Sequence, residues 1–283
     1  MIGDRTPGRI VFALFNYCFM GIYALFMVIP IVYILQLTLS GNPDPSFRII
    51  PLDFTFENYL YVVRRGLIVR PLWNSVVLSL SATLFSLVLT SVLAYALSDA
   101  TLPARKFFNL VVVLALLLNV GFLPKYLLVR DLGLINSYWS IILTGGIASF
   151  NVILMRNYFQ RLPRELFDTA RIDGAGELTV LTRIVVPLSL PVLATIFLFY
   201  FVDYWNEYFD VILYITDRAK HTLQVVLRSM IILEEDLGSD ADVMLLDNVK
   251  YTTVIVALIP IMMLYPFLQK YFTKGILLGS VKG

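Results

Sequence analysis

The chain has 283 residues, of which 59% are hydrophobic and only 15% charged, and its mean hydropathy is +0.80. A soluble domain is about 45–50% apolar and about 25% charged, so much of the apolar surface of this chain must face lipid. The net charge of +2 gives no reason to expect a nucleic-acid partner, and the single cysteine, Cys18, excludes an intrachain disulfide and a multi-cysteine metal site.

Six stretches without Asp, Glu, Lys, Arg or His predict six membrane-spanning helices, because a helix needs about 20 mostly apolar residues to cross the hydrocarbon core. None of them shows the period-two alternation of a membrane β-strand. The first is too long for the apolar region of a signal peptide, so we expect it to be retained. The sequence therefore predicts an all-α membrane protein with one transmembrane domain over residues 1–283. In chain order, the predicted spans are residues 11–36, 73–97, 107–128, 134–156, 186–210 and 251–271.

The distribution of Lys and Arg is the sequence guide to orientation. An even number of spans puts both termini on one side of the membrane. If that side is the cytoplasm, the inner segments carry only a narrow majority of the 22 basic residues. The two larger loops, residues 40–70 and 214–250, then lie outside, and basic residues such as Arg70 in the first of them weaken the assignment. The second loop is acidic between residues 234 and 247, and whether it contacts a partner protein stays open. Charge alone favours cytoplasmic termini only narrowly.

The segment 157–187, between the fourth and fifth predicted spans, has the pattern of two short helices joined by a turn. Pro163 suits the first turn of a helix, and Glu165 then lies near the positive end of the helix dipole. Gly174 should end this helix in a turn that requires a positive φ. A second amphipathic stretch over residues 177–186 leads to the next span. The predicted apolar stripe of the first helix comprises Leu162, Leu166, Phe167 and Ala170.

This segment resembles the EAA loop of permeases from binding-protein-dependent ABC importers. The family pattern is Glu-Ala-Ala, three residues, Gly, nine residues, Ile, any residue, Leu and Pro. The chain departs from it with Asp for Glu, Thr for Ala and Val186 for Leu, while Glu165 and the run 170–175 match the carbohydrate branch more closely. The residues alone also allow an ordinary amphipathic loop at the membrane interface. The spacing is met by Asp168-Thr169-Ala170, Gly174, Ile184 and Pro187.

The resemblance extends over essentially the whole chain and implies an ABC type I importer permease fold of the maltose-permease kind. The ending, residues 271–283, is similar to the tails of maltose-type permeases. In the family, the EAA helix docks in a cleft of a cytoplasmic ATPase, which implies that the loop 157–187 and both termini are cytoplasmic in a bacterial inner membrane. The residues to which the resemblance assigns ATPase coupling are Glu165, Asp168, Thr169, Ala170, Asp173, Gly174 and Ala175.

The resemblance also implies partners. They are a second homologous permease, two ATPase subunits, an extracytoplasmic solute-binding protein and an oligosaccharide substrate. The chain has no G-x-x-x-x-G-K-[ST] motif, so we expect ATP and Mg²⁺ to be bound by the partner ATPase, and no cofactor, metal or catalytic site in this chain. We expect the lone His221 to be a solvated loop residue.

The outer end of the fifth predicted span is unusually polar. Asp203, Glu207 and Asp210 would share one helical face, and Trp205 and Asn206 lie among them. Charges near membrane depth commonly face a cavity or a partner, and aromatic rings with neighbouring amides suit a sugar. One interpretation places Asp203, Trp205, Asn206 and Glu207 on the translocation path; the other is an interfacial aromatic belt with carboxylates in outside water.

The class of substrate follows from the resemblance alone. Residues 129–134 and 151–157 are most similar to permeases for complex oligosaccharides, a group that includes alginate importers. The expected mechanism is alternating access driven by ATP. Two other classes remain to be weighed: a secondary transporter, against which the charge-free spans argue, and a membrane scaffold or sensor that transports nothing.

Overall fold

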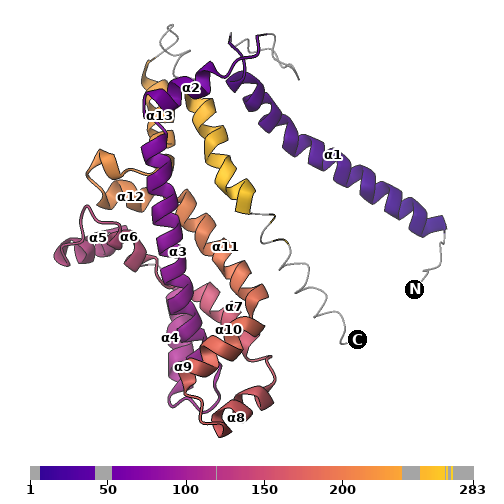
Figure 1. Ribbon diagram of the computed structural model, residues 1–283, viewed down its shortest axis with the longest axis vertical. Helices are drawn as coiled ribbons and strands as arrows, with labels where there is room; N and C mark the ends of the chain where they lie inside the picture. Colours follow the sequence, from indigo (N-terminus) through magenta and orange to yellow (C-terminus); the bar gives the residue numbers. More distant parts are fainter. Residues whose placement is uncertain are drawn as a thin grey trace. The chain divides into compact units, whose positions relative to one another are not determined.

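The computed structural model describes residues 7–41, 53–118, 120–237 and 249–264, together with the single residues 266 and 269. The chain divides into two compact units, one of Met1–Ile68 with Ser229–Val256 and the other of Val69–Arg228 with Ala257–Gly283. Within the described ranges the regular structure is helical, with no strand and one isolated bridge between Ser40 and Phe54. The predicted all-α class is therefore confirmed (Figure 1).

The first unit begins with α1 (Pro7–Thr38), which includes the first predicted span. Its apolar window is not buried at all within the chain. A helix of this kind suits lipid, because it satisfies its own backbone hydrogen bonds and needs no water. The carbonyl end is held by α2 (Glu57–Arg64), where the Asn58 amide donates to Thr38 O at 3.0 Å and to Ser40 O at 3.2 Å.

The second unit is built around α3 (Val69–Ser98) and α11 (Leu190–Asn206), with α7 (Ser149–Phe159) packed against both. Buried hydroxyl pairs join the two long helices: the Ser86 and Tyr204 oxygens are 2.8 Å apart, and those of Thr90 and Tyr200 are 2.7 Å apart. Ser and Thr hydroxyls are common between membrane helices, where they hydrogen-bond across the interface. The apolar core of the unit surrounds these pairs.

Three of the predicted spans are not continuous helices. Residues 107–128 form α4 (Arg105–Leu117) and α5 (Phe122–Asp131), which meet at 113°. Residues 134–156 form α6 (Trp139–Thr144) and α7, separated by a loop. By length and composition, two described helices could cross a membrane alone, or up to four could do so if each bent pair is one span.

The fifth predicted span, residues 186–210, is the third that is not continuous, because it contains a sharp bend near its start. α9 (Glu177–Val180), a π-helical turn (Leu181–Val185) and α10 (Val186–Leu188) lie at 87° to α11. Of the sixth predicted span, the structure describes a helix over Val249–Leu264, and the tail 271–283 lies outside the described residues.

The breaks have local causes that charge-free runs do not reveal. Gly121 has a φ of +74°, and a Pro in the first turn begins each of α5 and α11. Gly145 follows α6, and a Cβ there would lie 2.8 Å from the Tyr204 hydroxyl oxygen. This glycine is needed because the chain passes directly over the Tyr204 ring. The remaining described elements are α8 (Arg164–Ile172), α12 (Phe209–Tyr214), the 3-10 turn η2 (Arg218–Lys220) and α13 (Leu223–Leu237).

Candidate functional site

The predicted first helix of the EAA-like segment is α8, which lies at one end of the second unit (Figure 1). It starts directly after Pro163, as expected of a residue whose missing N–H is no loss in a first turn. Glu165 lies in its first turn and Arg171 in its last, so both charges oppose the helix dipole favourably. The helix-turn-helix expected from the sequence is confirmed, with α9 as the second helix.

The corner between α8 and α9 is a Schellman cap. Gly174 has a φ of +79°, as the sequence predicted. Its N–H donates to Arg171 O at 3.0 Å, and the Ala175 N–H donates to Ala170 O at 2.9 Å, which is the hydrogen-bond pair that defines this cap. The two alanines also pack against the core, supplying the apolar contact that accompanies the motif. A Cβ on Gly174 would meet nothing within 4 Å, so the need for glycine is conformational and not steric.

The inner face of α8 holds the helix on the second unit. Leu162, Phe167, Ala170 and Ala175 are partly buried against the core of the unit. Leu166 belongs to the predicted apolar stripe, but the structure leaves it 42% exposed, so its assignment to the stripe is wrong. Ala170 faces the chain's own core.

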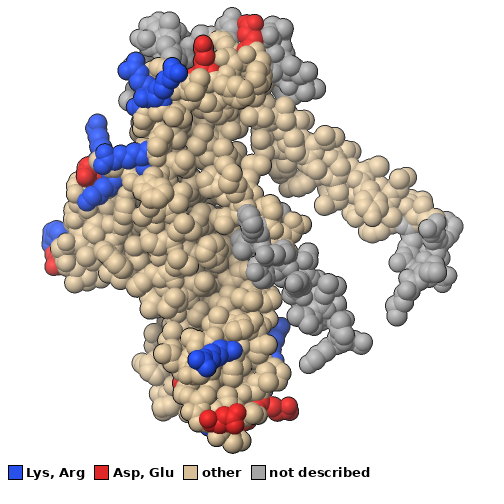
Figure 2. Space-filling view, viewed as in Figure 1, with Lys and Arg blue, Asp and Glu red and all other residues tan. Residues whose placement is uncertain are grey.

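The outer face of α8 is open. It combines carboxylates with Ile172, which is 86% exposed, and Leu178 on α9 is also well exposed. Figure 2 shows acidic atoms on the surface at the end of the unit that carries α8. The sequence analysis did not single out Ile172 or Leu178. An apolar residue on the outer face can be recognised only when it is known which face of the helix packs on the core. The predicted site residues that lie exposed here are Glu165, Asp168, Thr169, Asp173 and Gly174.

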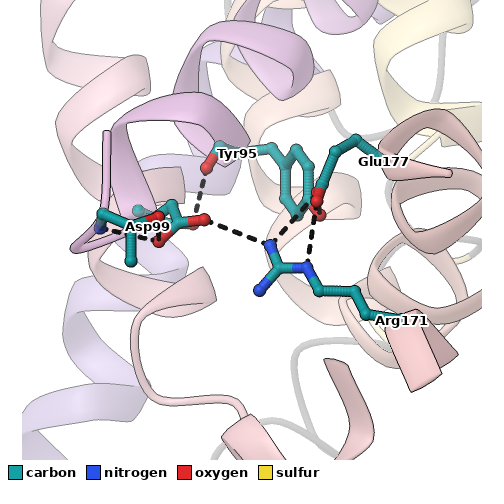
Figure 3. Close-up of polar contacts among 6 residues, drawn as sticks. Tyr95, Asp99, Arg171 and Glu177 are labelled. Carbon is teal, nitrogen blue, oxygen red and sulfur yellow. Dashed lines mark hydrogen bonds and ion pairs between the residues drawn. The ribbon is translucent and has the colours of Figure 1, made fainter. Parts of the chain in front are cut away.

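A network of charged side chains ties α8 and α9 to the end of α3 (Figure 3). Arg171 donates from Nε to Glu177 Oε1 at 2.9 Å, and from Nη2 to Asp99 Oδ2 at 3.1 Å. The Tyr95 hydroxyl donates to the same Glu177 carboxylate. The network therefore joins residues that are more than 70 positions apart in the chain, which is why the sequence did not predict it.

The ion pair between Asp99 and Arg171 favours the charged form of each residue. The Thr101 N–H and then its hydroxyl hydrogen-bond to Asp99 and, with Arg171, hold the pKa of the Asp99 carboxyl below its usual range. The hydrogen bond to Glu177 raises the pKa of the Arg171 guanidinium. Beside them, α3, α7 and α8 enclose a small cleft of about 160 Å³, lined in part by Tyr95, Asp99 and Phe167.

The far end of α11 differs from the prediction. The helix ends at Asn206, so Asp203, Glu207 and Asp210 do not share one helical face, and that prediction is wrong. Glu207 lies in the link to α12, where its Oε1 accepts from the Asp210 N–H at 3.0 Å. This hydrogen bond explains the break, because Glu207 satisfies a free N–H at the start of a new helix.

Two aromatic residues near this end are also placed differently from the prediction. Trp205 is only 1% exposed and stacks on Phe201 at a ring-centre distance of 5.8 Å, so its side chain does not face an open path. Asp203 and Asn206 are exposed, and the Gln224 amide donates to Asn206 Oδ1 at 3.5 Å. His221 is half-buried, with its ring Nε2 3.2 Å from Ile215 O, and is not the solvated loop residue that we expected.

Comparison with known proteins identifies the family. Residues 5–277 match the model of the binding-protein-dependent transport system inner membrane component. The chain is 38% identical over 282 residues to the polygalacturonan/rhamnogalacturonan transport system permease protein YtcP of Bacillus subtilis, covering 96% of this chain and 99% of that one. It is 31% identical over 236 residues to the arabinooligosaccharides transport system permease protein AraQ of Halalkalibacterium halodurans, covering 82% of this chain and 81% of that protein.

The fold comparison agrees. A chain in the crystal structure of a bacterial ABC transporter involved in the import of the acidic polysaccharide alginate matches with a TM-score of 0.86 and 30% identity, covering 95% of this chain and 99% of that one. Permease subunits of this kind are not enzymes, and the family implies an ATPase and a solute-binding protein as partners. The chain belongs to the family of binding-protein-dependent transport system inner membrane components, as a permease of a sugar ABC importer.

Proposed function

We propose that this chain is one of two related permease subunits that import an oligosaccharide by alternating access, driven by two ATPase subunits. The observation that carries the proposal is the geometry of α8: a short capped helix whose inner face packs on the core and whose outer face is open. Ile172 and the carboxylates around it offer an apolar centre with a charged rim to a docking cleft. This mixture of an apolar centre and a polar rim is typical of protein interfaces.

The coupling residues divide between the two faces. Glu165, Asp168, Thr169 and Asp173 are positioned to meet the ATPase, whereas Ala170, Gly174 and Ala175 hold the helix in place and shape the corner. The ATPase lies in the cytoplasm, so both termini of the chain are cytoplasmic in the inner membrane. ATP and Mg²⁺ belong to the ATPase subunits.

Alternating access links this end to the rest of the unit. When ATP closes the ATPase pair, the cleft carries α8 with it, and the attached helices open the path to the outside. Hydrolysis then restores the inward-facing state. An extracytoplasmic binding protein delivers the substrate to the outer end of α11, where Asp203 and Asn206 are exposed and Glu207 is half-buried.

The substrate class that we favour is an acidic oligosaccharide of the alginate kind. Two of the similar proteins belong to transport systems for uronate-containing polysaccharides, namely polygalacturonan/rhamnogalacturonan and alginate. An anionic chain would meet exposed basic side chains at Arg70 in the first turn of α3, at Lys125 in α5 and at Arg218 in η2, although the carboxylate of Asp203 is also exposed in the last turn of α11. Figure 1 shows that α5 lies away from α8. Long-range attraction of this kind raises the rate of encounter more than the affinity.

The test is reconstitution. The four kinds of subunit are assembled in vesicles, and ATPase activity and uptake are measured with the binding protein loaded in turn with alginate, galacturonate, arabinose and maltose oligosaccharides. The proposal expects the loaded binding protein to stimulate ATP hydrolysis and uptake, with the uronate oligomers most effective. Absence of stimulation by every sugar would contradict the importer role. Stimulation by the neutral oligomers alone would contradict only the substrate class.

A further inference from the structure

The corner between α8 and α9 presents a mechanical problem for a transporter of this kind. Only Asp173, Gly174, Ala175 and Gly176 connect the two helices, and two of these four residues are glycines. Glycine is the residue with the greatest backbone freedom. If this corner bent under load, a displacement of α8 would be absorbed there and would not reach the membrane helices.

Arg171 spans this corner. It stands in the last turn of α8 and donates two hydrogen bonds across the turn to Glu177, the first residue of α9, at 2.9 Å and 3.3 Å. The planar guanidinium fork fits a carboxylate in two places at once, which fixes orientation as well as distance. The corner is therefore braced by a side chain in addition to its Schellman hydrogen bonds.

The same guanidinium reaches a third helix. Its Nη2 lies 3.1 Å from Asp99 Oδ2, in the residue directly after the end of α3, and Tyr95, one turn earlier, donates to Glu177 (Figure 3). Arg105 Nε donates to Leu97 O at 3.0 Å and holds the same end of α3 from α4. The end of α3 is thus fixed from two sides by arginines.

From this end, α3 is connected to α11 along its length. The Thr90–Tyr200 and Ser86–Tyr204 hydroxyl pairs lie successively farther from Arg171 along α3. The alternative route runs through the chain itself, by way of α9, a π-helical turn and the 87° bend. The route through α3 avoids both irregular points.

We propose that Arg171 is a positioning residue that clamps α8 and α9 to the cytoplasmic end of α3, so that displacement of α8 moves the α3–α11 pair. This inference rests on the proposed function, because it assumes that an ATPase moves α8. The clamp is made of partly exposed side chains, with 38% of Arg171 and 34% of Asp99 accessible. Ion pairs of this exposure contribute little to stability, so loss of the clamp should change coupling and leave the fold intact.

The experiment measures sugar imported per ATP hydrolysed in reconstituted vesicles, together with the amount of ATPase subunit that copurifies. The variants are Arg171→Gln, Asp99→Asn and the double variant. Arg164→Gln is the matched control, because it removes another exposed arginine from the same helix. Among the described residues, Arg164 makes no ion pair. We expect the ratio of import to hydrolysis to fall about 2- to 30-fold in the single variants, and the double variant to be no worse than Arg171→Gln, because the two residues act as one pair.

Three results would overturn the clamp: an unchanged ratio in Arg171→Gln, an equal fall in Arg164→Gln, or a loss of uptake that merely follows loss of copurified ATPase. A wild-type complex that is not stimulated by loaded binding protein would instead overturn the proposed function. The two failures are therefore distinguishable, because one appears in the variants and the other in the wild type.

A covalent replacement gives a second, independent test. In a Cys18→Ser background, which removes the native thiol, Asp99→Cys and Arg171→Cys are joined by thiol cross-linkers of increasing length. If the clamp is correct, the double-cysteine variant without a linker should import little sugar per ATP hydrolysed. The ratio should recover with the linker whose length matches the native distance between residues 99 and 171. Failure of every linker to restore coupling, with cross-linking verified, would contradict the clamp.

Discussion

The two ends of the second unit treat their polar residues differently. At the α8 end, Arg171, Asp99 and Glu177 are partly exposed and connected to one another, and Arg171 bonds both to α9 and to the residue that follows α3. At the far end of α11, residues of equally suggestive chemistry serve the packing: Trp205 is buried, and Glu207 satisfies a backbone N–H. A polar or aromatic residue in a membrane helix therefore indicates function only after its structural use has been excluded.

The largest effect that follows from this comparison concerns Trp205. Replacing a buried Trp with Ala removes contacts and leaves a cavity, at a cost of about 3–5 kcal/mol. We expect Trp205→Ala to reduce the amount of assembled complex, with uptake falling in proportion. Detergent-stable complex is measured by size-exclusion chromatography, and uptake is expressed per complex. Asn206→Ala, at the exposed neighbouring position, is the matched control and should assemble normally. Normal assembly of Trp205→Ala with lost uptake would restore a substrate role for Trp205.

The next effect sharpens the description of the α8 corner. Gly174→Val forces a β-branched residue to a φ of +79°, which costs about 1–3 kcal/mol, and should distort the cap without a steric clash. We expect loss of the stimulated ATPase activity and of uptake, with pairing to the sister permease retained. Gly176→Ala is the control, because Gly176 has a φ of −71° and open space around it. Equal loss in both variants would show that the segment is merely sensitive to bulk.

A smaller effect on stability is expected at the Ser86–Tyr204 hydroxyl pair, which joins α3 to α11 between the two ends of the unit. Tyr204→Phe leaves the buried Ser86 hydroxyl without its partner, at a cost of about 1 kcal/mol, whereas Ser86→Ala with Tyr204→Phe removes both groups. We expect the double variant to be more stable than Tyr204→Phe alone. Thermal unfolding of the purified complex measures this, and additive losses would mean that the hydroxyl pair does not interact.

The smallest effect is a labelling pattern, measured on the two permease subunits without their ATPase subunits. In the Cys18→Ser background, Ile172→Cys and Arg130→Cys should react with membrane-impermeant thiol reagents from opposite sides, the first only when the cytoplasmic side is open. Both side chains are well exposed, so access should not limit the reaction. Labelling of both from the same side would contradict the proposed orientation.

The comparison also explains how far the sequence could lead. The helix over residues 164–172 and the positive φ of Gly174 were predictable, because Pro, Gly and the helix dipole act over a few residues. The helix breaks carried visible signals as well, in Gly121 and in Gly145-Gly146. Charge-free length was the wrong measure there, since it ignores the glycines and prolines that interrupt a helix.

The remainder depended on tertiary contact. The pairing of Arg171 with Asp99 requires that α8 return to the end of α3, and no local pattern specifies this. The burial of Trp205 likewise follows from which face of α11 is covered. From the sequence, that residue is equally compatible with a sugar, a lipid interface and a packed interior.

The two faces of α8 bear on how a permease of this family can change its partner over evolutionary time. Ala170 and Gly174 match the family pattern, and one packs on the core while the other forms the corner. Asp168 and Thr169, which depart from the pattern, both lie on the exposed surface. Substitutions there leave the permease's own packing unchanged. If α8 docks on an ATPase as we propose, such substitutions can accumulate together with changes in that ATPase, while the α8–α9 corner keeps its shape.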